Sequence, residues 1–159
     1  MALYIVRHAK AVQGYPDELR ELLPEGTAQA ERVGRRLADA GVTVPRIHHS
    51  GLVRARQTAE ILAGALGSGI EVEERAGMAP ESEPRTIAAW LDAEERAAGN
   101  VMVVSHMPFV DRLVSLLLTG DDAANLVDYK LCAVAKLTPR EGHGYRLSWL
   151  VTPRTASSG

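Results

Sequence analysis

The sequence is poor in cysteine, in long apolar runs and in net charge. Cys132 is the single cysteine among 159 residues, so we expect no internal disulfide and no cysteine-based metal cluster. No apolar run approaches the roughly 20 residues that span a bilayer. The first apolar run stops at Arg7, so we also expect no signal peptide. The formal net charge of −2 argues against nucleic acid as a partner, because proteins that bind it normally carry a basic face. Together these features favour a cytoplasmic protein without a membrane partner.

The composition is otherwise that of an ordinary globular chain, with 46% hydrophobic and 24% charged residues. A length of 159 residues suits one domain, and we find no linker, internal repeat or low-complexity block. We therefore predict a single domain over residues 1–152, followed by a flexible tail at 153–159.

The hydrophobic pattern indicates alternating strands and helices, followed by a pair of strands. Residues 3–7 and 101–105 are continuous apolar runs, which is typical of strands buried on both faces. Further strands are expected at 45–49, 70–73, 131–138 and 145–151, and helical spacing recurs at 26–40, 50–66, 87–94 and 110–117. This order predicts a three-layer α/β/α sandwich whose mostly parallel central sheet has an antiparallel edge.

Two histidines follow the two most apolar strands. Arg7 and His8 come at the end of the run at 3–7, and His106 comes directly after the run at 101–105. Arg54 falls in the first turns of the helix that Ser50 is expected to cap, where unpaired N–H groups and the helix dipole favour an anion. Ligands of such sheets bind beyond the carboxyl ends of the strands, so these side chains are expected to meet in one crevice.

The chemistry of this set points to phosphoryl transfer. The paired N–H donors of an arginine guanidinium group match the geometry of phosphate oxygens. A histidine can attack phosphorus as a nucleophile. A second histidine, if protonated, can neutralise charge that develops on the phosphoryl oxygens. Each residue alone has an ordinary structural explanation, and their equivalent positions carry the interpretation. Such a site needs no metal or other cofactor, because four cationic or hydrogen-bonding groups can supply the electrostatic stabilisation.

Three segments resemble the signature segments of the histidine phosphatase superfamily, also called phosphoglycerate mutase-like. They are "LYIVRHAKA", "SGLVRARQTAEIL" and "VMVVSHMPFV", and "LLPEGTAQAERVG" and "AGMAPESEP" also have counterparts in the family. The short chain is most similar to the small bacterial SixA-type phosphohistidine phosphatases. The resemblance implies a phosphoglycerate mutase-like fold and a phosphatase that forms a covalent phosphohistidine intermediate.

Carried over residue by residue, the resemblance makes His8 the nucleophile. It makes Arg7, Arg54 and His106 the remainder of the phosphate pocket, with Arg20 as a further candidate at its rim. The sequence departs from the family at Ala9, where relatives usually have glycine, and at Leu23, where many have threonine that could cap a helix.

The general acid and the substrate are less well defined by the sequence. Glu81 and Glu83, in the predicted loop at 76–84, are candidate acids for an ester substrate, although they could equally be a solvated acidic loop. A P–N bond to imidazole needs less help, because the leaving group has a conjugate-acid pKa of about 6.5. The longest insertion is the loop at 8–24, so the site is expected to be open.

Three functions remain compatible with these residues. The favoured one is dephosphorylation of phosphohistidine in a partner protein, and the second is a broad phosphomonoesterase acting on a small phosphoester. The third is a non-catalytic module that binds phosphate or a phosphoprotein, which would not require His8.

A metal site at His48 and His49 is not expected, because adjacent strand residues point to opposite faces. The oligomeric state and any closure of the loop at 8–24 stay open.

Overall fold

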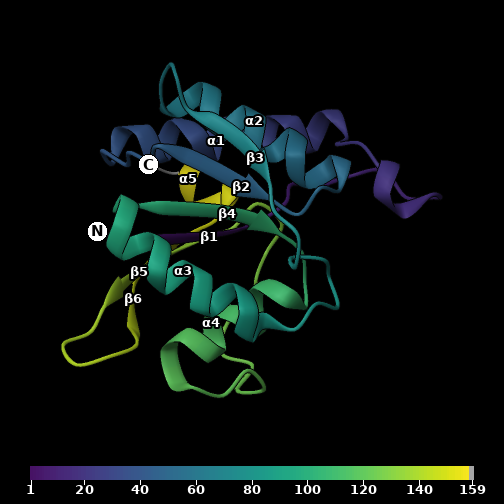
Figure 1. The fold of residues 1–159 in the computed structure, drawn as a ribbon. Coiled ribbons are helices and arrows are strands. Elements are labelled where there is room, and N and C mark those ends of the chain that lie inside the picture. The colour runs from purple at the N-terminus through teal and green to yellow at the C-terminus, as the bar shows by residue number, and fades with distance from the viewer. Residues whose placement is uncertain (158–159) are drawn as a thin grey trace.

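The computed structural model describes residues 1–157, whose centre is a six-stranded sheet in the order β3-β2-β4-β1-β5-β6 (Figure 1). The first four strands along the chain pair in parallel, and at one edge the fifth strand pairs antiparallel with both the first and the sixth. The strands are β1 (Leu3–Arg7), β2 (Arg46–His49), β3 (Glu71–Glu74), β4 (Val101–Ser105), β5 (Val134–Pro139) and β6 (Tyr145–Val151). The predicted fold class, a mostly parallel sheet with an antiparallel edge, is confirmed.

Helices cover both faces of this sheet. The main helices are α1 (Pro24–Asp39), α2 (Val53–Leu66), α3 (Pro84–Ala98) and α4 (Phe109–Thr119), with a short η1 (Asp17–Leu19) before α1. In Figure 1, α1 and α2 lie above the sheet, and α3 and α4 lie below it. None of the helices within residues 1–157 is long and apolar enough to cross a bilayer.

Strand β1 contributes to a separate apolar core on each face of the sheet. Leu3 and Ile5 pack in the core on the α3 and α4 side, and Tyr4 and Val6 pack in the core on the α1 and α2 side. All four side chains are buried because successive strand residues point to opposite faces. This explains the continuous apolar run in the sequence and fixes β1 at the centre of the fold, so that its last residues are positioned firmly.

The start of α1 makes a close contact with the chain that follows β1. Pro24 is the first residue of the helix, two residues earlier than predicted, because a missing N–H is tolerated in the first turn. A Cβ atom at Gly26 would clash with the carbonyl oxygen of Lys10. Only glycine therefore allows α1 to approach the segment that leaves the site.

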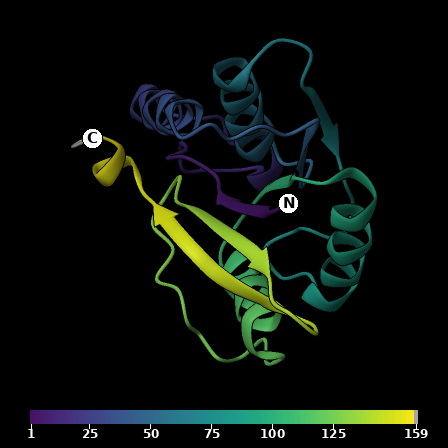
Figure 2. The ribbon, with the colours of Figure 1, turned by 90° about the vertical axis from the view of Figure 1, so that its left-hand side faces the viewer.

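The antiparallel edge is a long hairpin, seen in yellow-green in Figure 2. Strand β5 begins at Val134 and not at 131, because Cys132 has a left-handed backbone with φ of 59° and the chain still turns there. After β6, the short helix α5 (Pro153–Ser157) lies within the predicted tail and packs against α1. Residues 158 and 159 of that tail lie outside the described residues. The single domain over 1–152 and the flexibility of the tail stay predictions.

Candidate active site

The two histidines emerge side by side from neighbouring strands. Arg7 on β1 pairs in register with Ser105 on β4, so His8 and His106 both follow at the carboxyl ends of parallel strands. The backbone N–H of His8 donates to the carbonyl of Ser105 at 2.9 Å. The two imidazole rings have centroids 5.0 Å apart. The sheet register therefore creates a site from segments almost one hundred residues apart in the sequence.

Arg54 reaches His8 from the first turn of α2. Its side chain is buried, and Nε lies 3.4 Å from Nε2 of His8. The hydroxyl of Thr58, one turn later, donates to the carbonyl of Arg54 at 2.8 Å and accepts from the N–H of Ala9 at 3.0 Å. This contact fixes α2 against the segment that carries His8.

Arg7 is held by the loop before β5. Its Nη1 donates to the carbonyl of Tyr129 at 2.7 Å, and the Tyr129 hydroxyl donates to the carbonyl of Ile5 at 2.8 Å. Nε of Arg7 is buried without a hydrogen-bond partner among the described residues. The guanidinium is thus fixed at one end and retains a free donor.

These side chains line a cavity of about 310 Å³. Its lining consists of Arg7, His8, Arg20, Arg54 and His106, which were predicted as site residues, together with Lys10, Ala11, Gln13, Met107 and Leu131. Three guanidinium groups and no carboxylate stand among these residues of the described chain. The cavity is therefore electropositive and suits an anion.

His8 has a defined tautomer and is neutral near pH 7. Its Nδ1 lies 2.7 Å from the carbonyl oxygen of Ala9, which can only accept, so Nδ1 carries the hydrogen and Nε2 carries the lone pair. Burial lowers the pKa of His8 to about 4, and the positive charges of Arg54, Arg7 and Arg20 act in the same direction. A neutral imidazole with an unprotonated Nε2 is the form that can attack phosphorus.

His106 is also neutral near pH 7. Burial lowers its pKa to about 2, and the neighbouring His8 and Arg54 contribute in the same direction. Its Nε2 lies 2.6 Å from Oγ of Ser50, and its Nδ1 is buried without a hydrogen-bond partner among the described residues. The protonated His106 considered from the sequence is therefore not the resting form. A bound anion would favour it.

Ser50 does not cap α2 as predicted. The N-cap of α2 is Leu52, which makes no side-chain capping bond, and Ser50 lies two residues before it, outside the helix. Oγ of Ser50 accepts from the N–H of Leu52 at 3.3 Å while it contacts His106. Its position is better explained as orienting His106, a role that the sequence did not suggest.

Asp17 is a second residue that the sequence analysis missed. Its carboxylate lies 2.8 Å from Nη1 of Arg20 and 3.2 Å from Nη2 of Arg54. A hydrogen bond from Arg20 is the main reason that the pKa of Asp17 is lowered. The sequence spacing of Asp17 and Arg20 could have indicated this contact, because a carboxylate three residues before an arginine in a short turn can reach it.

The structure does not bring Glu81 or Glu83 into the cavity. Glu83 is the N-cap of α3, where Oε1 accepts from the N–H of Arg85 at 3.1 Å. Its other oxygen lies 3.8 Å from Arg112, and Glu81 is exposed in the preceding loop. Neither residue lines the cavity. Their capping and surface positions explain both residues without a catalytic role.

His48 and His49 point to opposite faces of the sheet. His48 meets the edge of Trp90 with ring centroids 4.6 Å apart, and Nδ1 of His49 accepts from the N–H of Gly51 at 3.1 Å. Among residues 1–157, no group of three or more histidine, cysteine or acidic side chains is arranged to hold a metal ion.

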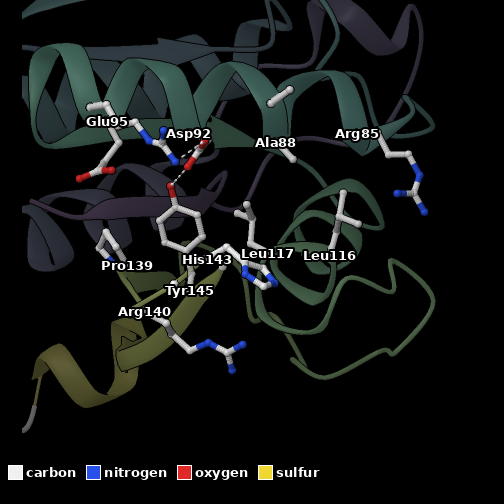
Figure 3. A pocket seen from close by; sticks show the side chains of 14 residues that line it. Arg85, Ala88, Asp92, Glu95, Leu116, Leu117, Pro139, Arg140, His143 and Tyr145 are labelled. Carbon is white, nitrogen blue, oxygen red and sulfur yellow. Dashed lines mark hydrogen bonds and ion pairs between the residues drawn. The ribbon is translucent and has the colours of Figure 1, made fainter.

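A larger cavity, of about 400 Å³, lies at the other end of the strands between α3, α4 and the β5–β6 hairpin (Figure 3). Its clearest polar contact joins the Tyr145 hydroxyl to Asp92 at 3.2 Å. It contains no buried histidine, because His143 in the hairpin turn is exposed. The smaller cavity at the carboxyl ends of β1 and β4 is therefore the candidate active site.

Comparison with known proteins agrees with the phosphoryl-transfer chemistry that this fold and site suggest. Residues 3–80 match the histidine phosphatase superfamily (branch 1). The chain therefore belongs to this superfamily and is a phosphatase.

Within the superfamily, the chain is similar to the phosphohistidine phosphatase SixA. It is 26% identical to SixA of Escherichia coli (strain K12) over 155 residues, which is 96% of this chain and 94% of that protein. A solved structure of SixA complexed with tungstate superposes with a TM-score of 0.87 at 26% identity, covering 97% of this chain and 98% of that one. An uncharacterized protein of Picosynechococcus sp. is 34% identical over 131 residues, 79% of this chain and 78% of its own.

Proposed function

We propose that this phosphatase removes the phosphoryl group from phosphohistidine in proteins, with His8 as the nucleophile. The observation that carries the proposal is the combination of a neutral His8, whose Nε2 is unprotonated, with a cavity lined by three arginines and no carboxylate. Arg7, Arg54, Arg20 and His106 would bind the phosphoryl oxygens. The similarity to SixA over the whole chain supports the same substrate class.

In the first step, Nε2 of His8 attacks phosphorus and the P–N bond of the substrate breaks. The hydrogen on Nδ1 of His8 stays hydrogen-bonded to the carbonyl of Ala9, so the phosphorylated ring becomes an imidazolium that this contact stabilises. The substrate imidazole, protonated at its other nitrogen, takes the electron pair of the broken bond and leaves as a neutral base. No carboxylic acid at the bridging atom is required.

In the second step, water attacks phosphorus and the bond to Nε2 of His8 breaks. The electron pair returns to Nε2, and the ring is again neutral with its hydrogen on Nδ1. The water proton leaves with the phosphate or to solvent. Burial and neighbouring arginines lower the pKa of His8 to about 4, which makes its imidazole a good leaving group in this step.

A small phosphoester is less well served by this site. Cleavage of a P–O bond produces an alkoxide that needs a proton, and the described residues that line the cavity offer no carboxylic acid. A non-catalytic module that only binds phosphate would not require a neutral, oriented His8. The cytoplasmic location inferred from the sequence remains a prediction.

The test is hydrolysis by the wild type and by His8→Ala, with a histidine-phosphorylated protein and an aryl phosphate as parallel substrates. The proposal predicts strong preference of the wild type for the phosphohistidine protein and loss of activity in the variant. Preference for the aryl phosphate would favour a phosphomonoesterase. Phosphate binding without turnover of either substrate would favour a binding module.

A further inference from the structure

Exposed apolar side chains are concentrated in the loop between β1 and α1. Val12, Tyr15 and Leu19 are 36%, 97% and 59% exposed, and they are three of the seven large hydrophobic side chains exposed in the described chain. Single exposed apolar residues are common, but three within eight residues need an explanation. In Figure 1 this segment is the purple part of the chain that projects beyond the sheet and the helices.

The segment forms one wall of the candidate active site. Gln13 lines the cavity, and the carbonyl of Asp17 accepts from Nη1 of Arg54 at 2.8 Å. Tyr15 is two residues from each, so its Cα lies within about 8 Å of both by chain geometry. Met107 and Leu131 contribute apolar surface to the lining of the same cavity.

The loop is held in place by hydrogen bonds. The N–H of Val12 donates to the carbonyl of Glu21 at 2.8 Å, and Nε of Arg20 donates to the carbonyl of Val12 at 2.6 Å. The two contacts of Asp17 with Arg54 fix its far end. Tyr15 and Leu19 are therefore presented to solvent by a preorganised segment, which lowers the entropy that a partner would have to remove.

We propose that Val12, Tyr15 and Leu19 form a docking rim for the folded protein that carries the phosphohistidine. This inference rests on the proposed function. A histidine side chain is short, so a phosphohistidine that reaches His8 brings its own backbone and neighbouring surface to the mouth of the cavity. A free phosphorylated amino acid would fill the cavity without covering the rim. Tyrosine is a frequent anchor of protein interfaces, since it buries a large area at the cost of few rotatable bonds.

The experiment compares hydrolysis of the same P–N bond in two substrates. One is free phosphohistidine, and the other is a histidine-phosphorylated protein prepared with phosphoramidate. The variants are Tyr15→Ser, Leu19→Ser and their combination. The matched control is Leu147→Ser, because Leu147 is 42% exposed on β6 and pairs with Leu137 towards the far end of the sheet. Steady-state KM and kcat are measured for every combination.

The proposal predicts that the wild type has the lower KM for the protein. It also predicts that the double variant raises this KM about tenfold, the effect of losing an interface anchor. The KM for free phosphohistidine should change less than twofold, and Leu147→Ser should behave as the wild type. Equal KM values of the wild type for both substrates, or rim variants with an unchanged KM for the protein, would overturn the docking rim. Wild type that hydrolyses neither substrate would instead overturn the proposed function.

Discussion

Asp17 contacts Arg54 through both its backbone and its side chain. The carbonyl of Asp17 accepts from Nη1 at 2.8 Å, and its carboxylate lies 3.2 Å from Nη2. The same carboxylate lies 2.8 Å from Arg20. The carboxylate of Asp17 therefore pairs with two of the guanidinium groups that would bind the phosphoryl oxygens. It competes with an anionic ligand for both of them.

The first prediction concerns this competition. Asp17→Asn keeps the backbone contact with Arg54 and removes one negative charge, so we expect inorganic phosphate to bind about three- to tenfold more tightly at low ionic strength. Competitive inhibition by phosphate measures the change, and the difference should shrink as salt is added. Weaker binding would mean that the carboxylate serves mainly to orient Arg54.

A second prediction concerns Ser50. Loss of its hydroxyl in Ser50→Ala leaves Nε2 of His106 without its contact at 2.6 Å, so we expect kcat to fall about tenfold while KM changes little. Nitrogen chemical shifts of His106 should show a mixture of tautomers in the variant. Ser50→Thr, which keeps a hydroxyl, should restore both properties. Normal tautomer signals together with reduced kcat would contradict this positioning role.

The third prediction is a dependence of stability on acid. The pKa of His8 is about 4 and that of His106 about 2 in the folded chain, against about 6.5 when unfolded. Between about pH 6.5 and 4, the unfolded chain therefore binds protons that the folded chain does not. The free energy of unfolding should fall as pH decreases through this window, by up to about 1.4 kcal/mol per pH unit for each histidine, and this loss should be absent above pH 6.5.

Urea unfolding at several pH values measures this dependence. His106→Gln should reduce the slope, and saturating phosphate should reduce it in the wild type, because a bound anion favours protonated imidazole. His143→Gln, at an exposed position in the hairpin turn away from the site, is the matched control for the substitution itself. A wild type equally stable at pH 7 and pH 4.5 would refute the burial effect.

The fourth prediction separates two glycines in helices. Gly26→Ala places a Cβ against the carbonyl oxygen of Lys10, so α1 must move and we expect a loss of about 2–3 kcal/mol. A Cβ added at Gly64, in α2, would have no neighbouring atom within 4 Å, so Gly64→Ala should stabilise by about 0.5–1 kcal/mol. Chemical denaturation measures both, and destabilisation of equal size would show that the close contact with Lys10 is unimportant.

The parts of the site on regular elements were predictable from the sequence. Continuous apolar runs identify β1 and β4 because both faces of these strands are buried, and the rule for ligand sites then brings His8 and His106 together. The position of Arg54 was predictable because it lies in the first turns of a helix that follows a strand. The antiparallel hairpin was predictable because the spacing of apolar residues changes from the helical pattern to the strand pattern in the last third of the chain.

The parts that depend on loop conformation were not predictable. Asp17 reaches Arg54 only because the loop that contains the short helix η1 packs against the start of α2. Ser50 resembled a cap because it lies near the start of α2, but the helix begins three residues later and leaves its hydroxyl beside His106. The position of Glu83 had a readable signal, since Pro84 after it marks the first turn of a helix.

The most direct test of the account is to trap the phosphorylated enzyme. Wild type mixed with a histidine-phosphorylated protein is quenched within one turnover at alkaline pH, digested and analysed by mass spectrometry. We predict a phosphoryl group on the peptide that contains His8, at Nε2, and none in His8→Ala. A wild type that turns over substrate without a phosphoryl group on His8, or with one on another residue, would contradict the central claim.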